Sequence, residues 1–277
     1  MPFTRFSRFT VLLVTLLTLT AASLFAAGEP HDGKVSAYLR GAYMTPDAAE
    51  AKLKSAGFEV LGKEQITPEL TSVLFTCPTL KKMANQPKRG FVGAMRLLSN
   101  KKENEITVTN PLYFAKAYMQ KAYDDAAAHK VLSKLNSALP GLKDSRDALK
   151  SGDLAGYHFT FGMPYYEDME KVASGAHDTL LQKAKATGNV TFELPLAKDR
   201  TLIGYKLSDK TAKFVNKIGT RNAVVLPYAI LIEGDKAYIL APKYYLALSY
   251  PQLKMTQFMT IATTPGKITK ECKAAFK

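Results

Sequence analysis

The sequence lacks the short motifs that mark common catalytic and nucleotide-binding sites. It contains no Cys-x-x-Cys, no Gly-x-Ser-x-Gly, no P-loop and no dinucleotide-binding glycine pattern. Its four histidines never occur at the spacing of paired zinc ligands with an acidic residue beside them. We therefore expect neither a metal site nor a cofactor, and the sequence leans away from an enzyme without excluding one.

Cysteine is scarce, with only Cys77 and Cys272 in the chain. In an oxidising compartment these two residues can form a disulfide, which would tie the end of the chain to its first half. The alternative is two free thiols. Cys77 also precedes Pro78 at a predicted strand-to-helix junction, where a helix N-terminus favours the thiolate, although a small buried apolar role is the favoured interpretation.

Long apolar runs are missing everywhere except near the N-terminus. There, a basic start is followed by an apolar stretch over residues 11–24 and by small residues at Ala26 and Ala27. This order is typical of a secretory signal peptide, which we predict over residues 1–27 with Ala26 or Ala27 as the last residue removed. The alternative is an uncleaved anchor, because the stretch approaches the ~20 residues that span a bilayer. Both interpretations place the remainder in the periplasm or outside the cell.

Acidic residues are too few to balance the basic ones. The chain has 38 Lys and Arg against 24 Asp and Glu, a net charge of +14. The predicted signal peptide holds Arg5 and Arg8 and no acidic residue, so its removal lowers the net charge by two, to +12. This charge favours anionic partners such as lipid headgroups, cell-wall polymers or acidic ligands, whereas export makes nucleic acid a poor candidate. The lysines are scattered, so simple solvation of helix faces is the alternative.

Three blocks of sequence recur in the same order, which indicates an internal duplication. The paired blocks begin at Ser36 and Ala155, at Thr79 and Thr211, and at Ile106 and Ala237. They align Arg89 with Arg221, Pro111 with Pro242, and Tyr113 with Tyr244. We predict a first unit over residues 33–140 and a second over 150–277, related by an approximate two-fold axis and joined by a connector over residues 136–152.

Each copy is predicted to contain a strand, a helix, two strands, a short helix, a two-strand hairpin and a helix. In the first copy Thr45 can cap a helix that begins at Pro46 and stops at Gly57. The hairpins are expected at residues 91–98 with 105–109, and at 223–232 with 237–240. This order predicts an α+β (α/β) fold in which each unit is a small mixed sheet covered by helices.

Three segments resemble the bacterial family called domain of unknown function 302. The run LPYAILIEGDKAYILAP from Leu226 is similar to the family's hairpin, and MTPDAAEAKLKSAGFEVL from Met44 is similar to its helix and strand. The run FTCPTLKKM from Phe75 resembles its Cys-Asn-Pro segment without the Asn. The resemblance implies a compact α/β unit, here doubled, and no established activity.

A few polar and aromatic residues are candidates for a binding site. His158 lies between aromatic residues on a predicted strand, where a half-buried structural role is the favoured alternative. Tyrosines gather around the two hairpins, and a tyrosine combines an apolar face with a polar tip, which suits recognition as well as core packing. The candidate ligand-binding residues are Arg89, Arg221, Tyr113, Tyr228, Tyr244 and His158.

The leading functional hypothesis is a non-enzymatic exported protein that binds a ligand or partner in the cleft between the two units. One alternative is a thiol-dependent enzyme or redox protein that uses Cys77. Another is a cationic protein that attaches to the cell envelope by its charge.

Overall fold

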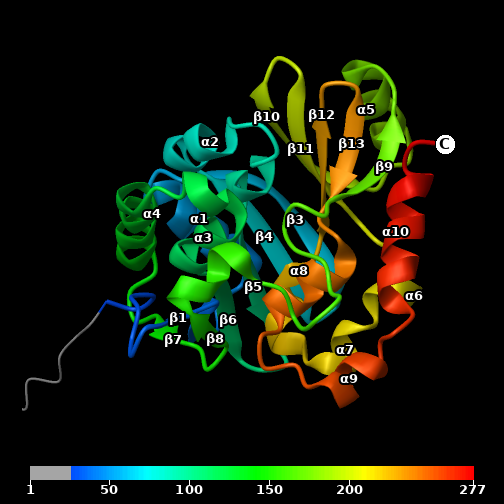
Figure 1. Ribbon diagram of the computed structural model, residues 1–277. Helices are drawn as coiled ribbons and strands as arrows, with labels where there is room; N and C mark the ends of the chain where they lie inside the picture. The colour runs from blue at the N-terminus through cyan, green and yellow to red at the C-terminus, as the bar shows by residue number, and fades with distance from the viewer. Residues whose placement is uncertain (1–25) are drawn as a thin grey trace, which may run out of the picture.

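The structure is a computed structural model that describes residues 26–277, and it confirms a mixed α+β fold (Figure 1). The predicted signal peptide lies almost wholly outside the described residues. Within them the strands form a six-stranded sheet, a five-stranded sheet and a two-stranded ribbon.

The six-stranded sheet is built from the first half of the chain and is antiparallel throughout. Its strands, in spatial order, are β3 (Glu59–Thr67), β4 (Leu70–Thr76), β5 (Met95–Asn100), β6 (Glu105–Thr109), β2 (Tyr38–Ala42) and β7 (Lys143–Asp144). The helices of this half are α1 (Pro46–Ser55), α2 (Pro78–Ala84), α3 (Pro111–Met119) and α4 (Asp125–Ala138), with 3-10 turns η1 (Gly90–Gly93) and η2 (Gln120–Ala122).

Helix α1 begins and ends where the sequence predicts. The Thr45 side chain accepts a hydrogen bond from the Ala48 amide at 3.2 Å, and Pro46 occupies the first turn. The chain leaves the helix through Gly57 with a φ of +79°, a conformation that glycine adopts without strain. Helix α1 then packs on β3 and β4, so one face of the six-stranded sheet is covered by its own helices.

The five-stranded sheet comes from the second half and is also antiparallel. Its spatial order is β10 (Val190–Ala197), β11 (Arg200–Tyr205), β12 (Tyr228–Glu233), β13 (Lys236–Ile239) and β9 (Glu170–Ser174). The helices are α5 (His177–Ala186), α6 (Asp209–Ala212), α7 (Val215–Ile218), α8 (Pro242–Ser249), α9 (Met255–Met259) and α10 (Thr264–Ala274), with the 3-10 turn η4 (Thr220–Val225). In Figure 1, α10 runs along the edge of the molecule opposite α4.

The predicted connector is ordered and pairs with the first half. Strand β7 extends the six-stranded sheet beside β2, while β8 (Ala148–Lys150) pairs with β1 (Lys34–Ser36). The 3-10 turn η3 (Ser151–Gly156) follows and contacts α3. The chain therefore reaches the second half only after η3.

The two larger sheets use their strands in the same order. Strands β3, β4, β5, β6 and β2 of the first correspond in chain order and position to β10, β11, β12, β13 and β9 of the second. Pro111 and Pro242 each occupy the first turn of the helix that follows the hairpin. This arrangement is the one that a duplication predicts, although the superposition of the halves by an approximate two-fold stays a prediction.

One of the three predicted block alignments is wrong. The segment from Ala155 was expected to form a strand equivalent to β2, but it holds the end of η3 and a loop, and the equivalent strand is β9. The aromatic alternation at residues 157–161 misled the prediction, because those side chains belong to a loop. The first strand of each hairpin also begins later than predicted, since residues 91–93 lie in η1 and residues 223–225 in η4.

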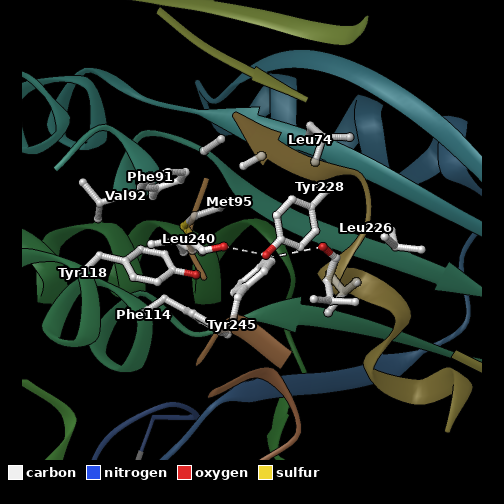
Figure 2. Packing of buried hydrophobic residues seen from close by; sticks show 14 of the residues in the cluster. Leu74, Phe91, Val92, Met95, Phe114, Tyr118, Leu226, Tyr228, Leu240 and Tyr245 are labelled. Carbon is white, nitrogen blue, oxygen red and sulfur yellow. Dashed lines mark hydrogen bonds between the residues drawn. The ribbon is translucent and has the colours of Figure 1, made fainter. Parts of the chain in front are cut away.

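The two halves share one hydrophobic core. The face of the six-stranded sheet away from α1 packs on the second half, where β10 lies against β3 and η4 lies against β5 and β6. In Figure 2, Leu74 and Tyr118 from the first half surround Tyr228 and Tyr245 from the second in one packed cluster. We call this contact between the halves the seam.

Candidate functional site

The three candidate tyrosines are buried in the core instead of lining a cleft. The Tyr113 hydroxyl donates to the Leu248 carbonyl at 2.8 Å, and the Tyr228 hydroxyl donates to the Leu240 carbonyl at 2.8 Å. The Tyr244 hydroxyl donates to a carbonyl of α3. Burial raises the pKa of each hydroxyl well above its usual value, which keeps all three neutral.

Two of these bonds cross the seam in a reciprocal way. Tyr113 in α3 donates to Leu248 in α8, and Tyr244 in α8 donates to Ala117 in α3 at 3.5 Å. Because Tyr113 aligns with Tyr244 and Ala117 with Leu248, each helix offers the other the same donor and acceptor positions. Such mutual contacts are typical of an isologous interface.

The two aligned arginines lie apart and have different partners. Arg89 is mostly buried; its Nη2 donates to Glu167 Oε1 at 2.7 Å, and its guanidinium lies 5.1 Å from the centre of the Tyr166 ring. Arg221 is more than half exposed and lies 3.3 Å from Glu103 and 3.5 Å from Glu105. Of the candidate ligand-binding residues, Arg221 is the one that lines an open cleft at the seam.

His158 lies in the loop between η3 and β9, so its predicted strand is wrong. Its ring stacks near Tyr165, with 4.5 Å between the ring centres. Its side-chain Nδ1 is buried without a hydrogen-bond partner.

The possible disulfide between Cys77 and Cys272 is not formed. Both thiols are free and buried. Cys77 is the N-cap that precedes α2 in the first half, whereas Cys272 lies in α10, which packs on α8 and β9 of the second half. Burial raises the pKa of the Cys272 thiol, so that thiol stays protonated and unreactive at neutral pH.

The seam holds an open cleft of about 280 Å³, lined by both polar and apolar groups. The cleft lies where four segments meet: strand β2, turn η4, the connector, and the segment from Tyr250 to α9. The lining residues are Arg40, Glu103, Asp147, Ile218, Gly219, Thr220, Arg221, Asn222, Tyr250, Gln252, Leu253 and Gln257. We call it the seam cleft.

Arg40 makes hydrogen bonds to several of the segments that meet at the seam cleft. It lies on β2 between β6 and β7, and its Nη1 donates to Glu105 Oε1 and Thr107 Oγ1, both at 2.8 Å. Its Nη2 donates to Asp147 Oδ2 at 3.0 Å and to Asn222 Oδ1 at 2.8 Å. One guanidinium thus joins the first sheet, the connector and the second half.

The lining of the seam cleft carries two charges of each sign, since Arg40 and Arg221 face the carboxylates of Glu103 and Asp147. The carboxylate of Glu105, which is not part of the lining, also pairs with both arginines, so the cleft has no excess of positive charge despite the basic chain. The Tyr250 hydroxyl donates to the Gly219 carbonyl at 3.2 Å, and burial raises its pKa, so it stays neutral. The Tyr250 side chain is only 4% exposed, so the cleft offers hydrogen-bond donors and acceptors more than an aromatic surface, and it does not select for anions.

The sequence did not single out Arg40, Asp147 or Asn222. These residues are separated by long stretches of chain, and only the folded seam brings them together. The available signal was a charged residue inside the apolar alternation of residues 36–42, which is costly on a buried strand unless the charge is paired.

A second seam pocket, of about 350 Å³, lies between the β3–β4 turn and α6. It is lined by Gln65, Ile66, Thr67, Pro68, Lys206, Asp209, Ala212, Lys213 and Asn216. Nearby Glu64 is buried on β3, and its Oε2 has no hydrogen-bond partner. Burial raises the pKa of this carboxyl to about 7, which Lys206 and Arg96 offset only in part.

Within residues 26–277 no three His, Cys, Asp or Glu side chains gather as a metal site would require. No helix in that range combines the length and the apolar character needed to cross a membrane.

Comparisons of the chain with models of protein families, with curated proteins and with solved structures give no match. The resemblance to the domain of unknown function 302 family therefore stays a prediction, and the site must be interpreted from its own chemistry.

Proposed function

We propose that this chain is an exported protein that binds a small, hydroxyl-rich polar ligand, such as a short saccharide of the cell envelope, in the seam cleft. The observation that carries the proposal is the lining of that cleft. Guanidinium, carboxylate and carboxamide groups surround a tyrosine at a junction between the two halves. Binding sites in proteins commonly occupy such junctions.

The balance of charge supports an uncharged ligand. A strong anion would have to compete with Glu103 and Asp147, and a strong cation with Arg40 and Arg221. A sugar hydroxyl both donates and accepts, so it can add to these groups without breaking their ion pairs. The volume of about 280 Å³ suits a ligand of one or two sugar rings.

Thermal-shift and calorimetric titration of the mature protein with cell-wall saccharides tests this proposal. A ligand that binds the folded state raises the melting temperature in a concentration-dependent way. Arg221→Ala combined with Gln252→Ala removes two exposed lining groups and should weaken binding at least tenfold. Lys52→Ala, an exposed change on α1, is the matched control and should bind normally.

Absence of binding across the saccharide panel, or equal binding by the double variant and the wild type, would contradict the proposal. Thiol chemistry at Cys77 has less support as an alternative. That thiol is buried, and the ring contact of His158 is with Tyr165.

A further inference from the structure

Four large apolar side chains are exposed within the described residues, and they gather on two neighbouring segments. Phe161 is 99% exposed, Met259 63%, Tyr165 48% and Met255 47%. The loop before β9 carries Phe161 and Tyr165, and α9 carries the two methionines. The segments touch through the rings of Phe159 and Phe258, whose centres are 5.8 Å apart. We call these four exposed residues the tip patch.

The turn that carries Phe161 is closed by a backbone hydrogen bond. The Met163 amide donates to the Thr160 carbonyl at 3.0 Å, and Gly162 has a φ of +76°. A β-turn with a positive φ at its third residue needs glycine there, and its second residue stands at the tip. The chain thus places a phenylalanine where it contacts nothing, although exposing such a side chain to water is unfavourable.

Helix α9 divides its side chains between two roles. Phe258 is buried, whereas Met255 and Met259 are four residues apart and share the outer face. The same short helix offers Gln257 to the seam cleft. In Figure 1, α9 lies at the lower edge of the molecule, away from the helices of the first half.

The basic residues beside the tip patch lie on its helix side. Lys254 is the N-cap of α9, and Lys217 donates to the Thr260 carbonyl just after the helix. The loop side has no Lys or Arg in residues 151–170, and its carboxylates near the patch have partners. Glu167 is paired with Arg89, Asp168 accepts a hydrogen bond from the Tyr165 amide, and Glu170 accepts one from the Thr269 hydroxyl.

We propose that the tip patch is a membrane-docking surface, in which Phe161, Met255 and Met259 enter the headgroup region of an anionic bilayer while neighbouring lysines contact its phosphates. Clustered exposed apolar groups mark interaction surfaces, and scattered ones do not. An aromatic tip beside methionines and lysines matches the layered chemistry of an anionic membrane surface, apolar inside and negative at the boundary. This surface is separate from the ligand lining proposed for the seam cleft.

The chain contains no tryptophan, so the fluorescence of an introduced tryptophan comes from a single known position. In the mature protein, Phe161→Trp introduces a single indole at the tip. With vesicles of phosphatidylglycerol and phosphatidylcholine, its emission should shift to the blue, whereas pure phosphatidylcholine vesicles should leave it unchanged.

Vesicle co-sedimentation then measures the contribution of the patch. Phe161→Ser combined with Met259→Ser should weaken binding to the anionic vesicles at least tenfold, whereas Ala262→Ser, an exposed change nearby, should bind like the wild type. Arg221→Ala with Gln252→Ala should also leave vesicle binding intact, so failure of the saccharide proposal is distinguishable from failure of this one. Melting curves verify that each variant is folded.

Two results would overturn the docking surface. One is vesicle binding that salt abolishes but the Phe161→Ser, Met259→Ser variant retains, which would assign attachment to charge alone. The other is absence of binding to the anionic vesicles. If the wild type then self-associates in sedimentation velocity and the same variant does not, the patch is a contact between copies of this chain.

Discussion

At the scale of single residues, the buried carboxyl of Glu64 should make stability depend on pH. Its pKa of about 7 in the folded protein lies above the ordinary value of 4.5, so the folded state holds the proton more tightly than the unfolded state. The contribution of Glu64 to the free energy of unfolding is then fully present below about pH 4.5, and it is lost as the pH rises through about 7. The upper bound of this loss is about 3 kcal/mol, since each pKa unit corresponds to about 1.4 kcal/mol.

Glu64→Gln replaces the carboxyl with a group that never ionises. We expect the variant to be more stable than the wild type at pH 8 and nearly equal to it at pH 5, measured as the free energy of unfolding in urea. Glu69→Gln, an exposed change in the turn of the same hairpin, should show no such dependence. A variant that is destabilised equally at both pH values would show that Glu64 is ionised and paired.

The reciprocal tyrosine bonds make a second prediction at this scale. Tyr113→Phe leaves the Leu248 carbonyl buried without its donor, which should lower the free energy of unfolding by about 1 kcal/mol. Tyr244→Phe should cost less, because its hydroxyl lies 3.5 Å from the Ala117 carbonyl. Tyr238→Phe, on a partly exposed residue of β13, serves as the control. Denaturant unfolding of the three variants tests the order.

At the scale of elements, the seam depends on the close approach of β3 and β10. Gly62 lies against the Thr191 carbonyl oxygen, and a Cβ at this position would collide with that oxygen and press on Phe192. Since the obstacle is backbone, Gly62→Ala should separate the two strands and destabilise the protein by about 1–3 kcal/mol.

Gly152→Ala is the matched control, because nothing lies within 4 Å of the added Cβ. We expect urea unfolding to give the wild-type value for this variant and a clear loss for Gly62→Ala. Equal stability of both variants would mean that β3 and β10 shift apart without cost.

The elements also show how far local sequence patterns reach. The cap at Thr45 and the stop at Gly57 were predicted because capping chemistry is local. The strand expected at residues 157–161 failed because the same aromatic alternation also suits a loop packed on α9 through Phe159. The predicted start of the first strand in each hairpin was too early, because a short buried apolar run has the same sequence pattern in a strand and in a 3-10 turn.

At the scale of the whole molecule, the order of elements and the α+β class could be predicted, but the site could not. Arg40 acquires its role from Glu105, Asp147 and Asn222, which lie on three other segments. Their convergence depends on how the two halves pack, and no local pattern encodes that packing. The prediction that the tyrosines line a cleft was wrong for the same reason. A side chain with an apolar ring and a polar tip fits a binding cleft and the buried seam equally well.

The shared core predicts that neither half folds alone. Tyr38 donates to Ser249, Ser72 to Leu226, and Arg96 to Pro227, so buried polar groups of the first half take their partners from the second. Separating the halves would expose the apolar face of each sheet and leave these groups unpaired.

We therefore expect fragments 27–156 and 157–277 to lack cooperative unfolding when they are expressed separately, with near-ultraviolet circular dichroism reporting loose packing. Mixing the fragments, or expressing them together, should restore a single transition, since the break at Gly156 falls at an exposed position with open space around it. Cooperative melting of either fragment alone would instead identify that half as an independent domain and the seam as a secondary contact.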